Sequence, residues 1–123
     1  MAKVLVVDDE TQVRSLIRAR LERAGYEVSE AADCESALAT YRQSAADVVI
    51  TDLVMPGERN GHELIRSLAE EFPDVRIVAI SGAVDRDIHG LFAAARNEGA
   101  VCTLMKPFTS EQLFESVRAV LGE

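Results

Sequence analysis

Residues 4–10 read Val4-Leu5-Val6-Val7-Asp8-Asp9-Glu10, four apolar residues followed at once by three acids. Valine dominates the apolar part, which favours a β-strand. An uninterrupted apolar run is typical of a strand that is covered on both faces, as the strands of parallel sheets are. The segment therefore predicts a buried strand with a group of acids at its carboxyl end.

Four more strand-like segments follow, each separated from the next by apolar residues at helical spacing. The five predicted strands cover residues 3–7, 26–31, 47–51, 75–80 and 100–105. Strict alternation of strands and helices requires parallel strands joined by helical crossovers on both faces. The second segment alternates polar and apolar residues, which marks it as the strand at the sheet edge. We predict an α/β fold, a three-layer, doubly wound, five-stranded parallel sheet.

The helices between these strands carry their own start and stop signals. The first is expected to bury a stripe formed by Val13, Leu16, Ile17, Leu21 and Ala24. Gly25 ends that helix, and Asp33 is a good N-cap for the second. Residues 62–72 and 87–97 form the next two. Thr109 begins the last, with Gln112 completing a capping box.

Length and composition limit the class of protein. The 123 residues suit one domain, taken as residues 1–123, and 48% of them are apolar. No apolar run approaches the ~18 residues that span a bilayer. Cys34 and Cys102 match no metal-binding spacing and follow no signal peptide, so we expect reduced thiols in a cytoplasmic protein. A net charge of −8 argues against direct binding to nucleic acid.

Chemically capable side chains stand where four of the five strands end. Asp8 and Asp9 follow the first strand, Asp52 the third, Ser81 the fourth and Lys106 the fifth. Parallel strands deliver their carboxyl ends to one edge, where ligands of such folds bind. Converging carboxylates repel one another unless a cation lies between them, and Mg²⁺ prefers carboxylate oxygens. The sequence therefore predicts a magnesium site at this edge.

The same set suits phosphoryl transfer. An aspartate can attack phosphorus and form an acyl phosphate, and the transfer then needs mainly charge neutralisation and positioning. Mg²⁺, the Lys106 ammonium and the Ser81 hydroxyl can each meet one phosphoryl oxygen. Each residue taken alone is an ordinary turn, cap or solvated side chain. Their occurrence together on four strand ends favours a site with Asp52 as the nucleophile.

These segments resemble the receiver domains of response regulators in two-component signalling, over residues 3–121. The matching motifs are residues 4–10, 52–57, 81–83 and 106–108. The resemblance implies a flavodoxin-like strand order 2-1-3-4-5 and a phosphoacceptor at Asp52. It implies that Asp9, Asp52 and the backbone carbonyl of Val54 contact Mg²⁺ directly, while Asp8 acts mostly through a bound water. It also implies a cis peptide bond before Pro107.

The resemblance implies a signalling switch rather than a classical enzyme. Asp52 would receive its phosphoryl group from a sensor histidine kinase or a histidine phosphotransfer protein. The chain would promote only its own phosphorylation and dephosphorylation. The surface around the 87–97 helix, the 100–105 strand and the last helix would then change. That change would reach an effector protein or an output domain outside this chain, with no membrane contact, and a phosphorylation-dependent dimer stays open.

The sequence departs from the usual receiver pattern at two positions, Gly61 and Thr103. Gly61 follows Asp52 by nine residues rather than eight, so the 57–60 loop is one residue longer. Thr103 occupies the position of an aromatic ring that ordinarily moves with the hydroxyl. Val54 and Ala83 stand where other receivers can orient a hydrolytic water, and neither side chain forms hydrogen bonds. We therefore expect slow self-dephosphorylation.

Three other functions fit less well. A phosphohydrolase of the haloacid dehalogenase type wants a second acid two residues after the nucleophile, where this chain has Val54. A nucleotide-binding module wants a Gly-rich turn after the first strand, not three acids. A pseudo-receiver acting only by protein contact should have lost an acid or the lysine. His62 and His89 are interpreted as surface residues, and residues 92–95 as either core or a docking face.

Overall fold

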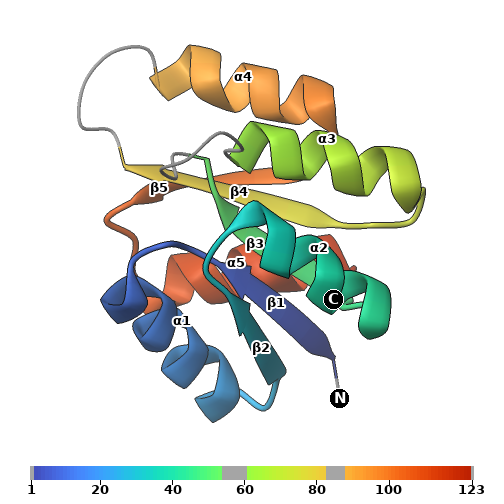
Figure 1. Ribbon diagram of the computed structural model, residues 1–123. Helices are drawn as coiled ribbons and strands as arrows, with labels where there is room; N and C mark the ends of the chain where they lie inside the picture. The colour runs from blue at the N-terminus through green and yellow to red at the C-terminus, as the bar shows by residue number, and fades with distance from the viewer. Residues whose placement is uncertain (1, 54–60, 83–87, 123) are drawn as a thin grey trace.

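Five parallel strands form one sheet in the order β2-β1-β3-β4-β5 (Figure 1), as predicted. The computed structural model describes residues 2–53, 61–82 and 88–122. The strands are β1 (Lys3–Val7), β2 (Glu27–Ala31), β3 (Val48–Asp52), β4 (Ile77–Gly82) and β5 (Cys102–Lys106). The helices are α1 (Thr11–Arg23), α2 (Cys34–Gln43), α3 (Gly61–Glu71), α4 (Ile88–Glu98) and α5 (Ser110–Leu121).

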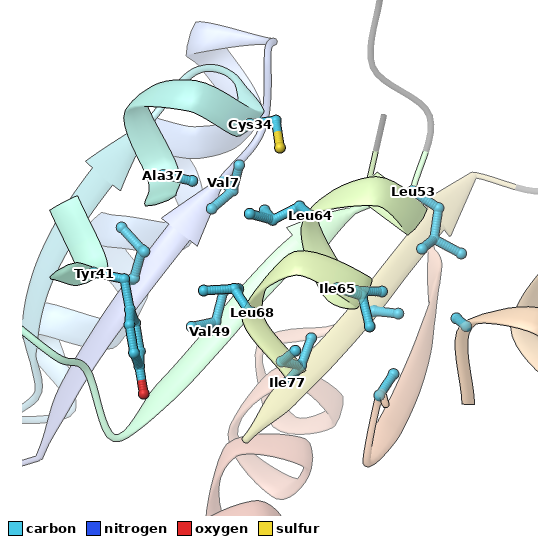
Figure 2. Packing of buried hydrophobic residues seen from close by; sticks show 14 of the residues in the cluster. Val7, Cys34, Ala37, Tyr41, Val49, Leu53, Leu64, Ile65, Leu68 and Ile77 are labelled. Carbon is cyan, nitrogen blue, oxygen red and sulfur yellow. The ribbon is translucent and has the colours of Figure 1, made fainter. Parts of the chain in front are cut away.

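Helices cover the sheet on both faces, which gives the predicted three layers. Helices α1 and α5 lie on one face, and α2, α3 and α4 lie on the other (Figure 1). Each face has its own apolar core. Figure 2 shows Leu64 and Leu68 of α3 in the same apolar cluster as Val7, Val49 and Ile77 of the sheet. The central strands are buried from both sides, which explains their continuous apolar sequence.

The local signals read from the sequence are present in the structure. The Asp33 side chain accepts a hydrogen bond from the Ser36 backbone N–H at 2.8 Å. Thr109 and Gln112 form the expected reciprocal capping box. Gly25 has a φ of 100° just after α1, a conformation that favours glycine. Strand β2 lies at the sheet edge.

Three strands reach one or two residues further toward their carboxyl ends than predicted. Strand β3 ends at Asp52, β4 at Gly82 and β5 at Lys106. Asp52, Ser81 and Lys106 are therefore strand residues, not loop residues. The hydrogen-bonded ladder fixes the backbone of all three, and this rigidity suits a site that works by positioning.

Two members of the predicted α1 stripe do not face the core. Leu16 is 49% exposed, because Ile17 and Leu21 supply the buried face of α1 and Leu16 lies beside that face. Ala24 is exposed because it follows the last helical residue. Among the described residues neither cysteine forms a disulfide; Cys34 is buried and Cys102 is partly buried. Within the described ranges, no helix has the length and apolarity needed to cross a membrane.

Candidate phosphoacceptor site

Lys106 joins two carboxylates at the carboxyl edge of the sheet. Its Nζ lies 2.8 Å from Asp52 Oδ2 and 3.0 Å from Asp8 Oδ2. The Asp8 and Asp52 side chains are only 1% and 7% exposed, and that of Lys106 is 19% exposed. A buried carboxylate is costly unless a cation and hydrogen bonds compensate its charge. The ammonium group supplies both for these two acids.

The surroundings keep Lys106 protonated. Burial on its own would lower the pKa of the ammonium group. The hydrogen bonds and charges of Asp52, and then those of Asp8, outweigh burial and raise the pKa of Lys106 above its usual value. The site therefore keeps a positive charge beside Asp52 throughout the neutral range.

Three acids approach one another closely enough to share a metal ion. One carboxylate oxygen each from Asp8, Glu10 and Asp52 lies within 4.8 Å of the other two. The Asp8 Oδ1 atom also accepts a hydrogen bond from the Glu10 backbone N–H at 2.9 Å. An all-oxygen set of this kind fits Mg²⁺ better than a softer metal.

This group overlaps the predicted ligands only in part. Asp8 and Asp52 belong to it, whereas Asp9 is exposed and does not. Glu10 belongs to the group. In the sequence analysis, Glu10 was noted as one of three acids after β1 and was not predicted as a ligand. Val54, the source of the predicted carbonyl ligand, lies outside the described residues.

The Ser81 hydroxyl is buried and unsatisfied. Ser81 is 0% exposed, and the described part of the chain offers its Oγ no hydrogen-bond partner. Ser81 follows Ile80, the register partner of Asp52 on the neighbouring strand. A buried hydroxyl without a partner costs about 1–3 kcal/mol. An incoming group with oxygen acceptors would satisfy it.

Gly61 lets the start of α3 approach the end of β3. A Cβ atom on Gly61 would lie 2.1 Å from the Asp52 carbonyl oxygen and 2.6 Å from the Leu53 Cα. The Gly61 N–H donates to the Leu53 carbonyl at 3.1 Å. Only glycine fits this contact, so Gly61 allows the start of α3 to lie directly against the Asp52 backbone. The 57–60 loop, which the resemblance makes one residue longer than usual, lies outside the described part.

Other residues discussed in the sequence analysis are not part of the acidic site. His62 Nδ1 lies 2.5 Å from Glu98 Oε1 and joins α3 to α4, so it is a half-buried link and not a free surface residue. The Thr103 hydroxyl accepts a hydrogen bond from Arg96 at 3.3 Å. The 92–95 run divides, with Phe92 and Ala95 buried and the two alanines between them exposed. The side chain of His89 lies outside the described part.

The peptide bond between Lys106 and Pro107 is cis, as the resemblance implied. Phe108 packs partly buried against the core beneath α1 and α5. Met55, the other apolar residue beside the site in the sequence, lies outside the described residues.

Comparison with known proteins agrees with this geometry. The chain is 36% identical over 121 residues to the probable transcriptional regulator ycf27 of Porphyridium aerugineum, covering 97% of the chain and 48% of that protein. The chain thus spans about half the length of the curated relatives it matches. The receiver domain of NtrX from Brucella abortus superimposes with a TM-score of 0.90 at 31% identity, covering 97% of this chain and 98% of that one.

Vibrio cholerae chemotaxis protein CheY4 superimposes with a TM-score of 0.88 at 32% identity, covering 98% of this chain and 99% of that one. The profile of the response regulator receiver domain matches residues 4–118. Sequence, fold and the acidic pocket agree: the chain belongs to the response regulator receiver domain family.

Proposed function

We propose that Asp52 is the phosphoacceptor of this receiver domain and that Asp8, Ser81 and Lys106 assist the transfer. Receiver domains are signalling switches rather than classical enzymes. The observation that carries the assignment is the Lys106 ammonium 2.8 Å from a nearly buried Asp52 carboxylate. The Ser81 hydroxyl supports it, because it lies one residue beyond the register partner of Asp52 and the described residues leave it without a hydrogen-bond partner. Residues 1–123 are assigned to one receiver domain.

The transfer is a displacement at phosphorus. A carboxylate oxygen of Asp52 forms the new P–O bond as the P–N bond to a donor histidine breaks, and the imidazole leaves with the electron pair of that bond. Negative charge accumulates on the equatorial phosphoryl oxygens. Lys106 neutralises part of that charge, and the Ser81 hydroxyl donates a hydrogen bond to it.

Receiver domains bind Mg²⁺ at an acidic cluster. In this chain Asp8, Glu10 and Asp52 are close enough to share such an ion. Asp9 and the Val54 carbonyl remain ligands by resemblance, so Glu10 and Asp9 are competing candidates for one position. When bound, Mg²⁺ would offset the charge of the carboxylates and of the incoming phosphoryl group.

Receiver domains work with histidine kinases and with output domains. We propose that a sensor histidine kinase or a histidine phosphotransfer protein phosphorylates this chain in the cytoplasm. The phosphorylated form then changes the surface around α4, β5 and α5. The recipient is an effector protein, an output domain beyond these residues or a second receiver. Direct contact with nucleic acid is not part of this proposal, because the chain carries a net charge of −8.

Labelling with acetyl phosphate tests the proposal. In the presence of Mg²⁺, intact-mass measurement should show one added phosphoryl group on the wild type and none on Asp52→Asn. Asp74→Asn is the matched control, since it removes an exposed carboxylate of a loop outside the site. That variant should be labelled like the wild type. Undiminished labelling of Asp52→Asn, or labelling of the wild type to the same extent with and without Mg²⁺, would overturn the assignment.

We also propose that the phosphorylated form loses its group slowly without a partner phosphatase or back-transfer to a kinase. By resemblance, positions 54 and 83 are where a side chain would orient the hydrolytic water, but Val54 and Ala83 cannot form a hydrogen bond through their side chains. Both residues lie outside the described part, so the proposal rests on their chemistry alone. Val54→Asn or Ala83→Glu should speed the decay of labelled protein in Mg²⁺. Decay of the wild type within seconds would contradict it.

A further inference from the structure

Arg14 of α1 ties the acidic site to the edge strand of the sheet. Its NH1 group donates a 2.7 Å hydrogen bond to the backbone carbonyl of Asp8. Its Nε group donates to Glu30 Oε1 of β2 at 2.9 Å. The Arg14 side chain is only 15% exposed. One guanidinium thus spans from β2 to the residue that holds Lys106 and takes part in the acidic group.

Every polar atom of Asp8 has a partner, and Arg14 supplies one of them. The Asp8 backbone N–H donates to the Ala31 carbonyl at 3.2 Å, and Ala31 directly follows Glu30. The Asp8 Oδ1 atom accepts from the Glu10 N–H, and Oδ2 accepts from Lys106. The peptide that leaves β1 is therefore fixed on its carbonyl side by Arg14. Without this bond, the Asp8 carbonyl would lose its hydrogen bond to α1.

Glu30 holds Arg14 in place. Its second carboxylate oxygen accepts from Arg18 NH1 at 2.6 Å, and Arg18 also pairs with Glu22 at 3.2 Å. The hydrogen bond from Arg18 lowers the pKa of Glu30, and the bond from Arg14 adds to this effect. Glu30 therefore stays ionised at neutral pH. Arg18 shares the carboxylate with Arg14, but its hydrogen bonds within the described residues go to Glu30 and Glu22 and not to Asp8.

We propose that the Arg14–Glu30 pair positions the Asp8–Glu10 turn for metal binding, so that Arg14 is a positioning residue of the phosphoacceptor site. The inference rests on the proposed function, because it assumes that the acids bind Mg²⁺. Residues that orient metal ligands from behind commonly contribute a factor of about 10–100 to metal affinity. The planar fork of Arg suits this task, because it meets two acceptors at fixed directions.

Simple electrostatics predicts the opposite effect. Removing a positive charge near a cation site should strengthen binding of Mg²⁺, because the two repel each other. Loss of positioning should weaken binding. The sign of the change in Mg²⁺ affinity therefore separates the two roles. A loss of overall stability does not separate them.

The experiment titrates Mg²⁺ alone into the isotope-labelled chain and follows backbone amide shifts of the 8–11 and 51–53 segments. The variants are Arg14→Ala, the control Arg18→Ala, and Glu30→Ala. Arg14→Ala and Arg18→Ala both remove one charge from α1 and one ion pair from Glu30, but only the first removes the bond to Asp8. Thermal unfolding without metal confirms that each variant is folded at the temperature of the titration.

We expect Arg14→Ala to raise the Kd for Mg²⁺ about tenfold, and Arg18→Ala to change it less than about twofold. Glu30→Ala should weaken binding several-fold, and the Arg14→Ala/Glu30→Ala double variant should bind like Arg14→Ala, since both changes break one unit. If Arg14→Ala does not fold, the comparison of Glu30→Ala with Arg18→Ala decides in the same way.

Two outcomes would overturn the inference. In the first, the wild type binds Mg²⁺ but Arg14→Ala binds it as tightly as Arg18→Ala or more tightly, which leaves the proposed function intact. In the second, the wild type shows no saturable Mg²⁺ binding, which removes the metal-dependent proposal together with this one. Labelling by acetyl phosphate in saturating Mg²⁺ gives an independent reading, since it should recover in Arg14→Ala if only affinity is affected.

Discussion

Lys106 Nζ lies 2.8 Å from Asp52 Oδ2, although the two residues are the last of β5 and β3, with β4 between them. The lysine therefore reaches past one whole strand to meet the proposed phosphoacceptor. The same ammonium lies 3.0 Å from Asp8, the residue that follows β1. One cation thus holds together three strand ends, and its loss should affect both stability and chemistry.

Lys106→Met should destabilise the protein in the absence of metal by about 2–3 kcal/mol, somewhat less than the loss of one partner from a fully buried pair. Asp8 and Asp52 would then face each other without a counter-charge. Mg²⁺ should restore more stability to this variant than it adds to the wild type, because it would replace the missing charge. Urea unfolding with and without Mg²⁺ measures both effects.

Lys3→Met is the control for this prediction. The Lys3 ammonium lies 3.8 Å from Glu27 Oε2, and both side chains are well exposed. Such a surface pair contributes about 0–1 kcal/mol. Equal losses in the two variants, or the same response to Mg²⁺, would show that Lys106 does not neutralise the acidic site.

Ser81→Ala should leave the unphosphorylated protein as stable as the wild type or more stable by up to about 1 kcal/mol, because it deletes a buried hydroxyl for which the described residues offer no partner. Thr51→Val is the matched control, since the buried Thr51 hydroxyl donates to the Asp52 carbonyl at 3.0 Å. That variant should lose about 1 kcal/mol. Phosphorylation of Ser81→Ala by acetyl phosphate should nevertheless slow, and an unchanged rate would remove Ser81 from the site.

Gly61→Ala should cost about 3 kcal/mol, because the new Cβ would collide with the backbone of Asp52 and Leu53. Gly122→Ala provides the comparison: its φ is 80°, and, its chain neighbours apart, no atom of the described residues lies within 4 Å of the added Cβ. That change should cost only about 1–2 kcal/mol, the penalty of a left-handed conformation. Chemical denaturation gives both values. A smaller loss for Gly61→Ala than for Gly122→Ala would contradict the close approach.

The Glu30 network should produce an acid-dependent term in stability. The pKa of Glu30 is lowered in the folded state, so the unfolded chain binds this proton more readily. Its contribution is fully present above its unfolded pKa of about 4.3 and is lost as pH falls through the lower folded pKa. Glu30→Gln should therefore flatten the decline of unfolding free energy below that pH.

Glu27 is an exposed residue on the same strand. Glu27→Gln should leave the decline of unfolding free energy at low pH (the acid limb) close to that of the wild type. Denaturant melts from pH 6 to pH 3 compare the three proteins. Identical acid limbs for Glu30→Gln and the wild type would mean that the pair with Arg14 and Arg18 adds no pH-dependent stability.

The periodicity of the sequence was sufficient to predict the three layers and the edge position of β2. The strand order was predicted only from the resemblance to receiver domains. It predicted the convergence of Asp8, Asp52 and Lys106, because all three follow or end strands of a parallel sheet. It did not predict that Glu10 rather than Asp9 joins the acidic group, since consecutive acids in a turn give no sign of which carboxylate approaches Asp52. Leu16 was misplaced because a helical stripe does not define the width of the buried face.

Contacts between side chains far apart in the sequence were also beyond prediction. The hydrogen bonds from Arg14 to Glu30 and to the Asp8 carbonyl depend on how α1 packs against the edge strand β2. The link between His62 and Glu98 depends in the same way on the packing of α3 against α4. Residue type and spacing are compatible with many partners for such long side chains. The partner is determined only by how the helices pack in the folded structure.

The most direct test of the central claim is the location of the phosphoryl group. Protein labelled with acetyl phosphate in Mg²⁺ can be treated with borohydride, which reduces an acyl phosphate to the alcohol and releases phosphate. Peptide sequencing by mass spectrometry then finds the converted residue. The account predicts homoserine at position 52 in place of Asp52 and conversion nowhere else. Conversion at Asp8, Asp9 or Glu10, or a label that resists borohydride, would contradict it.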